Sequence, residues 1–149
     1  MANSPLSVRR FFILFSICWV ALIVDHFLVL HWFGLSWKAA LIDSGISNAI
    51  LLLASLLVMN TLRYYLPRGE QYVNIFSLVL LLTVAWLVIS KWLMKLCISD
   101  MVPGYRDMLQ HSLPIRFSIG FLLLGCITMI SILWYNQLEQ KENENRKAD

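Results

Sequence analysis

The stretch FSIGFLLLGCITMISILWY, from Phe117 to Tyr135, decides the fold class of this chain. It contains no charged residue, and at ~1.5 Å per helical residue it is long enough to cross a hydrocarbon core of ~30 Å. None of the apolar runs alternates as a barrel strand would. We therefore predict an all-α integral membrane bundle of four antiparallel transmembrane helices. The four spans are expected at about Phe11–Trp32, Ile46–Leu66, Val73–Leu93 and Phe117–Tyr135.

The composition also points to the membrane. Of the 149 residues, 59% are hydrophobic and 14% are charged, whereas a soluble domain is nearer half apolar and a quarter charged. The net charge of +3 fits a membrane protein and gives no reason to expect nucleic acid as a partner. The lipid bilayer is the expected surrounding, and no cofactor or metal is predicted.

The stretch WYNQLEQKENENRKAD, from Trp134 to Asp149, leaves the last span and becomes charged at once. Glu142 and Arg146 stand at i, i+4 in the order that supports a helix. One interpretation is a solvated, partly disordered terminus. The other, which we adopt, is a short charged helical tail over residues 136–149. It would begin a signalling helix that continues into a soluble domain beyond Asp149.

Lys and Arg near the span ends predict the orientation. With four spans, the two termini and the second connection share one side. That side carries Arg9, Arg10, Arg63, Arg68, Lys141, Arg146 and Lys147. The opposite side carries Lys38, Lys91, Lys95, Arg106 and Arg116. The excess of seven over five predicts that residues 1–10 and the tail are cytoplasmic.

The connections differ in character. Leu66–Tyr72 reads as a short turn with two helix breakers. Ser36 is a candidate N-cap, so the second helix is expected to begin well before its apolar run. Met94–Pro114 is the longest connection. Within it, Tyr105–Ser112 is compatible with a short interfacial helix.

Polar residues at membrane depth are candidate functional groups, because an ionisable side chain inside a span is costly. Asp25 and His26 lie in the first run and Lys91 in the third, at similar depths from one side. We predict an Asp25–Lys91 ion pair beside His26. Two alternatives stay open: the acid and His26 reach interfacial water, or they form a proton or ligand site. Asn48 and Asn60 are expected to hydrogen-bond between helices.

The fourth run carries a stripe of small residues. Ser118, Gly125 and Thr128 fall at i, i+7 and i+10, while Gly120 lies off that line. Small residues allow membrane helices to approach closely. The stripe is therefore predicted to pack against the other three helices, with a second copy of the chain as the alternative.

Three segments carry a resemblance to a known family. They are SLPIRFSIGFLLLGCITMISILWYNQLEQKENENRKAD at Ser112–Asp149, RYYLPRG at Arg63–Gly69 and ALIDSGISNAILLLA at Ala40–Ala54. Together with the rest of the chain they resemble the amino-terminal membrane region of LytS-type bacterial sensor histidine kinases. The resemblance implies a multi-pass protein of the bacterial cell (inner) membrane that works as a homodimer. It also implies a cytoplasmic kinase domain in cis, through which alone a response regulator would be reached.

The family's phosphotransfer residues match no position of this chain, and no other catalytic constellation appears. The chain itself is therefore not expected to be an enzyme. We predict a membrane anchor and signal-input module of a two-component sensor histidine kinase. The main alternative is a small four-span transporter or proton-coupled carrier that uses Asp25. A membrane-embedded enzyme and a plain assembly partner are further alternatives.

Overall fold

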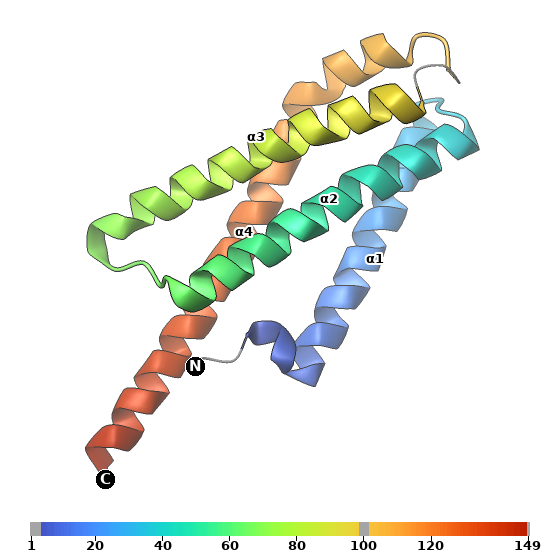
Figure 1. Ribbon diagram of the computed structural model, residues 1–149. Coiled ribbons are helices and arrows are strands. Elements are labelled where there is room, and N and C mark those ends of the chain that lie inside the picture. Colours follow the sequence, from blue (N-terminus) through green and yellow to red (C-terminus); the bar gives the residue numbers. More distant parts are fainter. Residues whose placement is uncertain (1–3, 99–101, 149) are drawn as a thin grey trace.

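The computed structural model describes residues 4–98 and 102–148, and within these ranges the chain is helical and has no strand (Figure 1). Its elements are η1 (Pro5–Ser7), α1 (Arg9–Trp32), α2 (Trp37–Tyr64), η2 (Gly69–Gln71), α3 (Tyr72–Cys97) and α4 (Tyr105–Ala148). In the described ranges four helices, α1 to α4, are long and apolar enough to cross a membrane. The predicted all-α class is confirmed, and the four long apolar helices are consistent with the predicted multi-pass membrane protein. The predicted N-terminal segment, the longest connection and the tail each include residues outside the described ranges.

The start of α2 follows from a local capping interaction. Ser36 is the N-cap, and its hydroxyl accepts a hydrogen bond from the backbone N–H of Ala39 at 3.4 Å. Gly34, with φ of 91°, makes the preceding turn in a conformation that side chains disfavour. The predicted cap is thus confirmed, and α2 begins at Trp37, well before the apolar run that starts near Ile46. Asp43 consequently lies inside a helix.

The last helix is longer than predicted. One helix, α4, contains the predicted interfacial helix at Tyr105–Ser112, the predicted span at Phe117–Tyr135 and the tail as far as Ala148. Pro114 lies inside it. A proline there removes one backbone hydrogen bond and crowds the preceding turn, which bends a helix rather than ending it when packing holds both sides. Figure 1 shows the first turns of α4 angled away from the rest.

The helices pack through three clusters of buried side chains along the bundle. At one end, Leu30 of α1, Ala40 of α2, Met94 of α3 and Tyr105 of α4 meet in one cluster. A middle cluster is centred on Trp86, and a third joins the later part of α2 to the start of α3 and to α4. This arrangement fits the course of the chain, which turns back at each connection in Figure 1.

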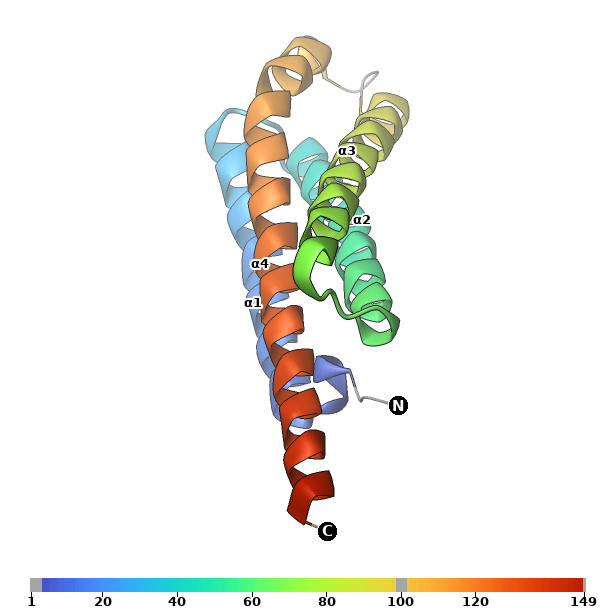
Figure 2. The same cartoon turned by 90° about the vertical axis from the view of Figure 1, so that its left-hand side faces the viewer.

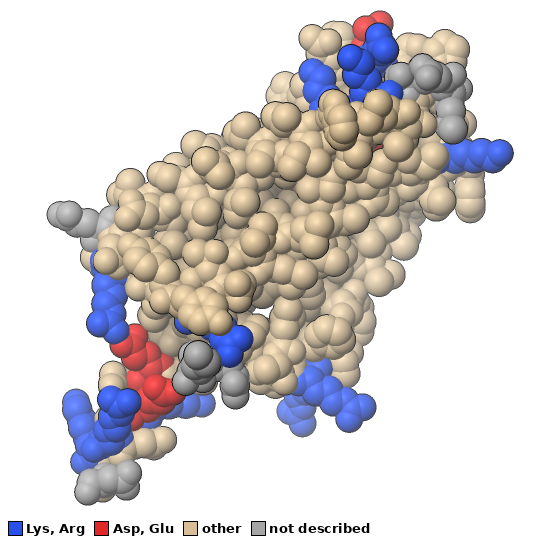
Figure 3. Space-filling model, viewed as in Figure 1, with Lys and Arg blue, Asp and Glu red and all other residues tan. Residues whose placement is uncertain are grey.

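The helices are not equally buried. Trp19 and Leu30 are the buried residues of α1, whereas α2 buries a continuous stripe from Ala39 to Leu62. In Figure 2, α4 extends beyond the other helices at its C-terminal end. Figure 3 shows Lys and Arg gathered towards the two ends of the molecule, with a broad band lacking them between. Such a distribution suits a protein whose middle lies in hydrocarbon.

The face of α4 that packs inward differs from the predicted stripe. Of the stripe only Thr128 is buried, while Ser118 is exposed and Gly125 would meet no neighbouring atom if it carried a Cβ. The close approach occurs at Gly120, where a Cβ would lie 2.5 Å from a ring carbon of Trp86. The buried line instead runs in steps of four from Arg116, through Gly120, to Thr128. Ser118 and Gly125 therefore do not face the other three helices, and their packing against a second copy of the chain stays a prediction.

Replacing Gly120 by Ala should destabilise the bundle, because the indole of Trp86 is held by a hydrogen bond and cannot move aside freely. Overpacking a core costs ~1–3 kcal/mol, which outweighs the ~0.5–1 kcal/mol gained from better helix propensity. Gly125→Ala is the matched control and should stabilise by about that propensity gain. The free energy of unfolding of both variants is measured in mixed micelles, with circular dichroism as the probe. Equal free-energy changes for the two variants would contradict the assigned packing face.

Candidate functional site

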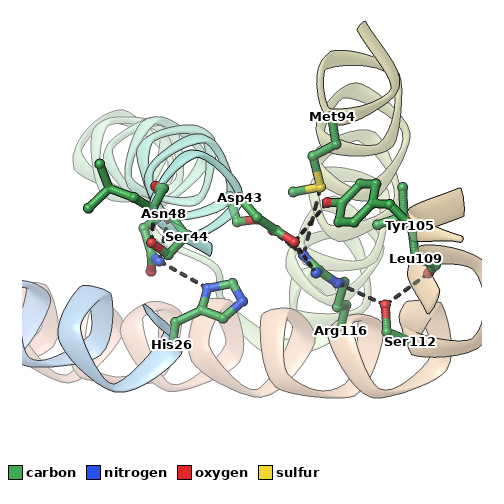
Figure 4. Close-up of polar contacts among 11 residues, drawn as sticks. His26, Asp43, Ser44, Asn48, Met94, Tyr105, Leu109, Ser112 and Arg116 are labelled. Carbon is green, nitrogen blue, oxygen red and sulfur yellow. Dashed lines mark hydrogen bonds and ion pairs between the residues drawn. The ribbon is translucent and has the colours of Figure 1, made fainter. Parts of the chain in front are cut away.

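A buried ion pair joins α2 to α4. The guanidinium of Arg116 donates to both oxygens of the Asp43 carboxylate, from Nη1 to Oδ1 at 2.8 Å and from Nη2 to Oδ2 at 2.6 Å. The Asp43 side chain is fully buried and that of Arg116 is 10% exposed. Figure 4 shows the two side chains approaching each other from different helices. The bidentate geometry fixes both distance and orientation, as this class of ion pair does.

Neighbouring side chains complete the hydrogen bonding of the carboxylate. The Tyr105 hydroxyl donates to Oδ2 at 2.8 Å, and the Ser47 hydroxyl donates to Oδ1 at 3.2 Å. Each oxygen of Asp43 therefore accepts two hydrogen bonds. Nothing of the carboxylate is left unsatisfied, which is the condition under which a charge is tolerated in an apolar environment.

The guanidinium of Arg116 is equally well surrounded. Its Nε donates to the Ser112 hydroxyl at 3.1 Å, and its Nη1 lies 3.3 Å from the Ser47 hydroxyl and 3.9 Å from the Met94 sulfur. Ser112 stands one turn before Arg116 on the same helix and Met94 comes from α3. We call Asp43, Ser47, Tyr105, Ser112 and Arg116 the ion-pair cluster.

The charges of Asp43 and Arg116 cancel, but placing each of them in an apolar environment costs free energy. A single charged residue at the centre of a membrane helix costs ~2.5–3.5 kcal/mol on insertion scales. A paired and fully hydrogen-bonded ion pair offsets this cost, whereas removing one partner leaves a buried charge without compensation. The pair consequently constrains the packing of α2 and α4: any displacement of one helix along the other breaks the hydrogen bonds.

A second polar contact links α1 to α2. The Asn48 amide donates to Nδ1 of His26 at 3.1 Å and to the backbone carbonyl of Ser44 at 2.7 Å (Figure 4). The predicted interhelical role of Asn48 is confirmed, whereas Asn60 is exposed. The indole N–H of Trp86 donates to the Ser47 carbonyl at 2.8 Å and ties α3 to the same turn of α2.

A cleft of about 140 Å³ lies beside the ion-pair cluster. Its polar lining includes Asp25, His26, Asn48 and Arg116. Its apolar lining consists of Leu22, Val29, Leu51, Trp86, Ile119 and Leu123. The cleft is large enough to hold water molecules or a small ligand, and the groups at its wall can both donate and accept hydrogen bonds.

The predicted Asp25–Lys91 pair is not formed. Both side chains are exposed, and neither Asp25 nor Lys91 takes part in an ion pair with another described residue. The two residues do not meet because their helices are not neighbours: α1 packs mainly against α2, whereas α3 packs against α2 and α4. Matching depth along two helices does not make them neighbours. Asp25 does line the cleft together with His26.

A third polar contact lies at the opposite end of α4. Arg68, in the connection after α2, forms an ion pair with Glu139 of the charged tail. Both side chains are substantially exposed, so the pair stabilises the fold only slightly. It nevertheless marks the point at which the tail passes the rest of the bundle.

Comparison with known proteins adds no identification: no protein-family model, no curated protein and no solved structure matches the chain. The resemblance to LytS-type sensor kinases therefore stays a prediction. The function of the site has to be argued from its geometry.

The substitution Asp43→Asn should lower the free energy of unfolding by ~3–5 kcal/mol, because it leaves Arg116 buried without its counter-charge. Arg116→Gln should cost a similar amount. The double variant should lose clearly less than the sum of the two, since it carries no buried charge.

Asp107→Asn is the matched control, because Asp107 is exposed in the first turn of α4, outside the predicted span, and should change stability by less than ~1 kcal/mol. Reversible unfolding in mixed micelles measures all four proteins. Strict additivity of the Asp43 and Arg116 effects would argue against the pair.

Proposed function

We propose that this chain is the membrane anchor and signal-input module of a bacterial two-component sensor histidine kinase. In this proposal the four helices span the cell membrane in antiparallel order, with both termini in the cytoplasm. A change at the outer face or in the polar region would move α4, and the charged tail would pass that movement to a cytoplasmic kinase domain. The chemistry of phosphotransfer would belong to that domain.

One observation supports the proposal: α4 is continuous from the ion-pair cluster to Ala148 in the charged tail. Arg116 lies near its beginning, and Glu139 lies where the helix passes the last of the bundle. From residue 140 to residue 148 its side chains are exposed. A rigid helix transmits a shift or rotation over its length, so a displacement at Arg116 would reappear in the tail.

The ion-pair cluster favours two distinct positions of α4 over a continuous range of positions. The hydrogen bonds between Asp43 and Arg116 are short and directional, so a new position of α4 has to replace them with another set. The cleft beside them offers a place where a ligand or a change in hydration would favour one set over another. A switch requires such a difference in interaction between two states.

A homodimer is part of the same proposal. The family resemblance implies it, and the largely unburied apolar surfaces of α1 and α3 leave room for a second copy. In such a dimer the two tails would lie near each other in the cytoplasm. The response regulator would be engaged only through the kinase domain.

Inserting one alanine after Leu138 should change the kinase activity of the intact protein severalfold. One residue rotates everything beyond it by ~100°, so the tail would present a different face to the kinase domain. Inserting a full heptad is the control, because it returns the helix to within ~20° of its original phase. The measurement is histidine phosphorylation from labelled ATP in membranes that contain the intact protein. Unchanged phosphorylation with both insertions would refute signal relay through α4.

A carrier that uses Asp25 is the second candidate function, because Asp25 and His26 line the cleft together. The input-module proposal predicts that the full chain in proteoliposomes gives no proton flux above that of empty vesicles. Asp25→Asn should then behave like the unmodified chain. A potential-driven flux, read with an internal pH dye, that Asp25→Asn abolishes and Asp107→Asn preserves would instead establish the carrier.

A further inference from the structure

A long apolar groove runs between α1 and α4, apart from the ion-pair cluster. Its volume is about 250 Å³. It begins at η1 and Phe11, and it ends at Leu22 and Leu123, two residues that also line the polar cleft. Its remaining lining residues are Leu14, Phe15, Cys18, Trp19, Met59, Cys126, Ile127, Ile130 and Ser131.

The groove exists because α1 packs mainly against α2 and does not pack closely against α4. The α1 residues that line it recur at helical spacing, from Phe11 through Leu14, Phe15 and Cys18 to Leu22, and so form one face of the helix. At one end the ring of Phe11 meets that of Trp134 edge-on, with 4.9 Å between centroids. This contact and η1 mark that end of the groove.

The size and lining of the groove suit an acyl chain. An apolar protein cavity of ~150 Å³ already binds benzene, so a groove of about 250 Å³ has room for a chain segment. A chain seated there would touch α1, α2 and α4 at once. A lipid lying against a convex helix surface makes fewer contacts. Filling the groove would therefore be favoured over ordinary lipid contact by the gain in dispersion interactions.

Positive charge near this end of the groove favours an anionic headgroup. Arg9 and Arg10 directly precede Phe11 and are both exposed. No ion pair or hydrogen bond of their side chains occurs with the rest of the described chain. Because they directly precede the groove-lining Phe11, these two guanidinium groups lie near this end of the groove. They complement a phosphate-bearing anionic headgroup whose tail lies in the groove.

We propose that the groove between α1 and α4 is a binding site for an anionic phospholipid. One acyl chain lies along Phe15, Cys18 and Ile127, and the headgroup phosphate lies at Arg9 and Arg10. The bound chain fills the space between the two helices and reaches the residues that border the polar cleft. This site does not depend on the signalling role proposed above.

The test uses the full chain in phosphatidylcholine nanodiscs with a trace of photoactivatable lipid. Two probes carry the same diazirine-labelled acyl chain, one on phosphatidylglycerol and the other on phosphatidylcholine. After illumination, mass spectrometry maps the labelled residues. The phosphatidylglycerol probe should label groove-lining residues of α1 and α4 in clear excess over the phosphatidylcholine probe.

The decisive variant replaces both arginines, Arg9 and Arg10. An anionic headgroup gains ~1 kcal/mol per basic residue near it, so Arg9→Gln with Arg10→Gln should reduce the excess by about fivefold per arginine. Lys91→Gln with Lys95→Gln removes two exposed charges from α3 and should leave the excess unchanged. Because all four residues are exposed, both variants should unfold like the original chain, and this is checked in parallel.

Two results would overturn the proposal. Equal labelling by both probes, spread over the exposed faces of all the helices, would mean that only bulk lipid surrounds the protein. A groove protected from both probes, together with crosslinks between copies through Cys18 or Cys126, would make a second copy of the chain the occupant.

Discussion

The structure depends on the buried ion pair between Asp43 and Arg116. An isolated charge in hydrocarbon is unfavourable, so these two residues have to meet, and they can do so only with α2 and α4 in one relative position. That requirement rotates α4 about its axis and turns the line from Arg116 through Gly120 to Thr128 inward. It also explains why a glycine rather than a larger residue faces Trp86.

Around this fixed centre the helices are held unequally. α2, α3 and α4 share buried clusters and polar contacts, whereas α1 is attached mainly to α2 and keeps most of its surface exposed. Its polar link is the contact of His26 with Asn48. The polar cleft and the apolar groove both lie along α1. The structure thus combines a tightly specified core with one loosely packed helix, an arrangement suited to an element that responds to its surroundings.

The sequence was sufficient for the fold class, because long apolar runs admit few alternatives in a membrane, and for the cap at Ser36. The sequence was not sufficient to predict which helices, and which of their faces, pack against each other. Asp43 lay outside the predicted apolar run and was not among the candidate site residues, although the predicted cap at Ser36 already implied that it is helical. Two signals were available: Asp43 with Ser47 and Ser112 with Arg116 are polar pairs at i, i+4, each facing one side of a helix. The Asp25–Lys91 pairing failed because depth alone does not say which helices touch.

The central claim is that Asp43 and Arg116 form a direct pair in the bilayer. Solid-state NMR on the full chain in lipid vesicles, with ¹³Cγ-labelled aspartate and ¹⁵N-labelled arginine, measures the dipolar coupling between carboxylate carbon and guanidinium nitrogen. In the described ranges this is the single Asp–Arg ion pair. We expect a strong coupling, consistent with N–O distances of 2.6 and 2.8 Å, that disappears in Arg116→Gln and persists in Arg106→Gln. No coupling in the unmodified chain would contradict the account.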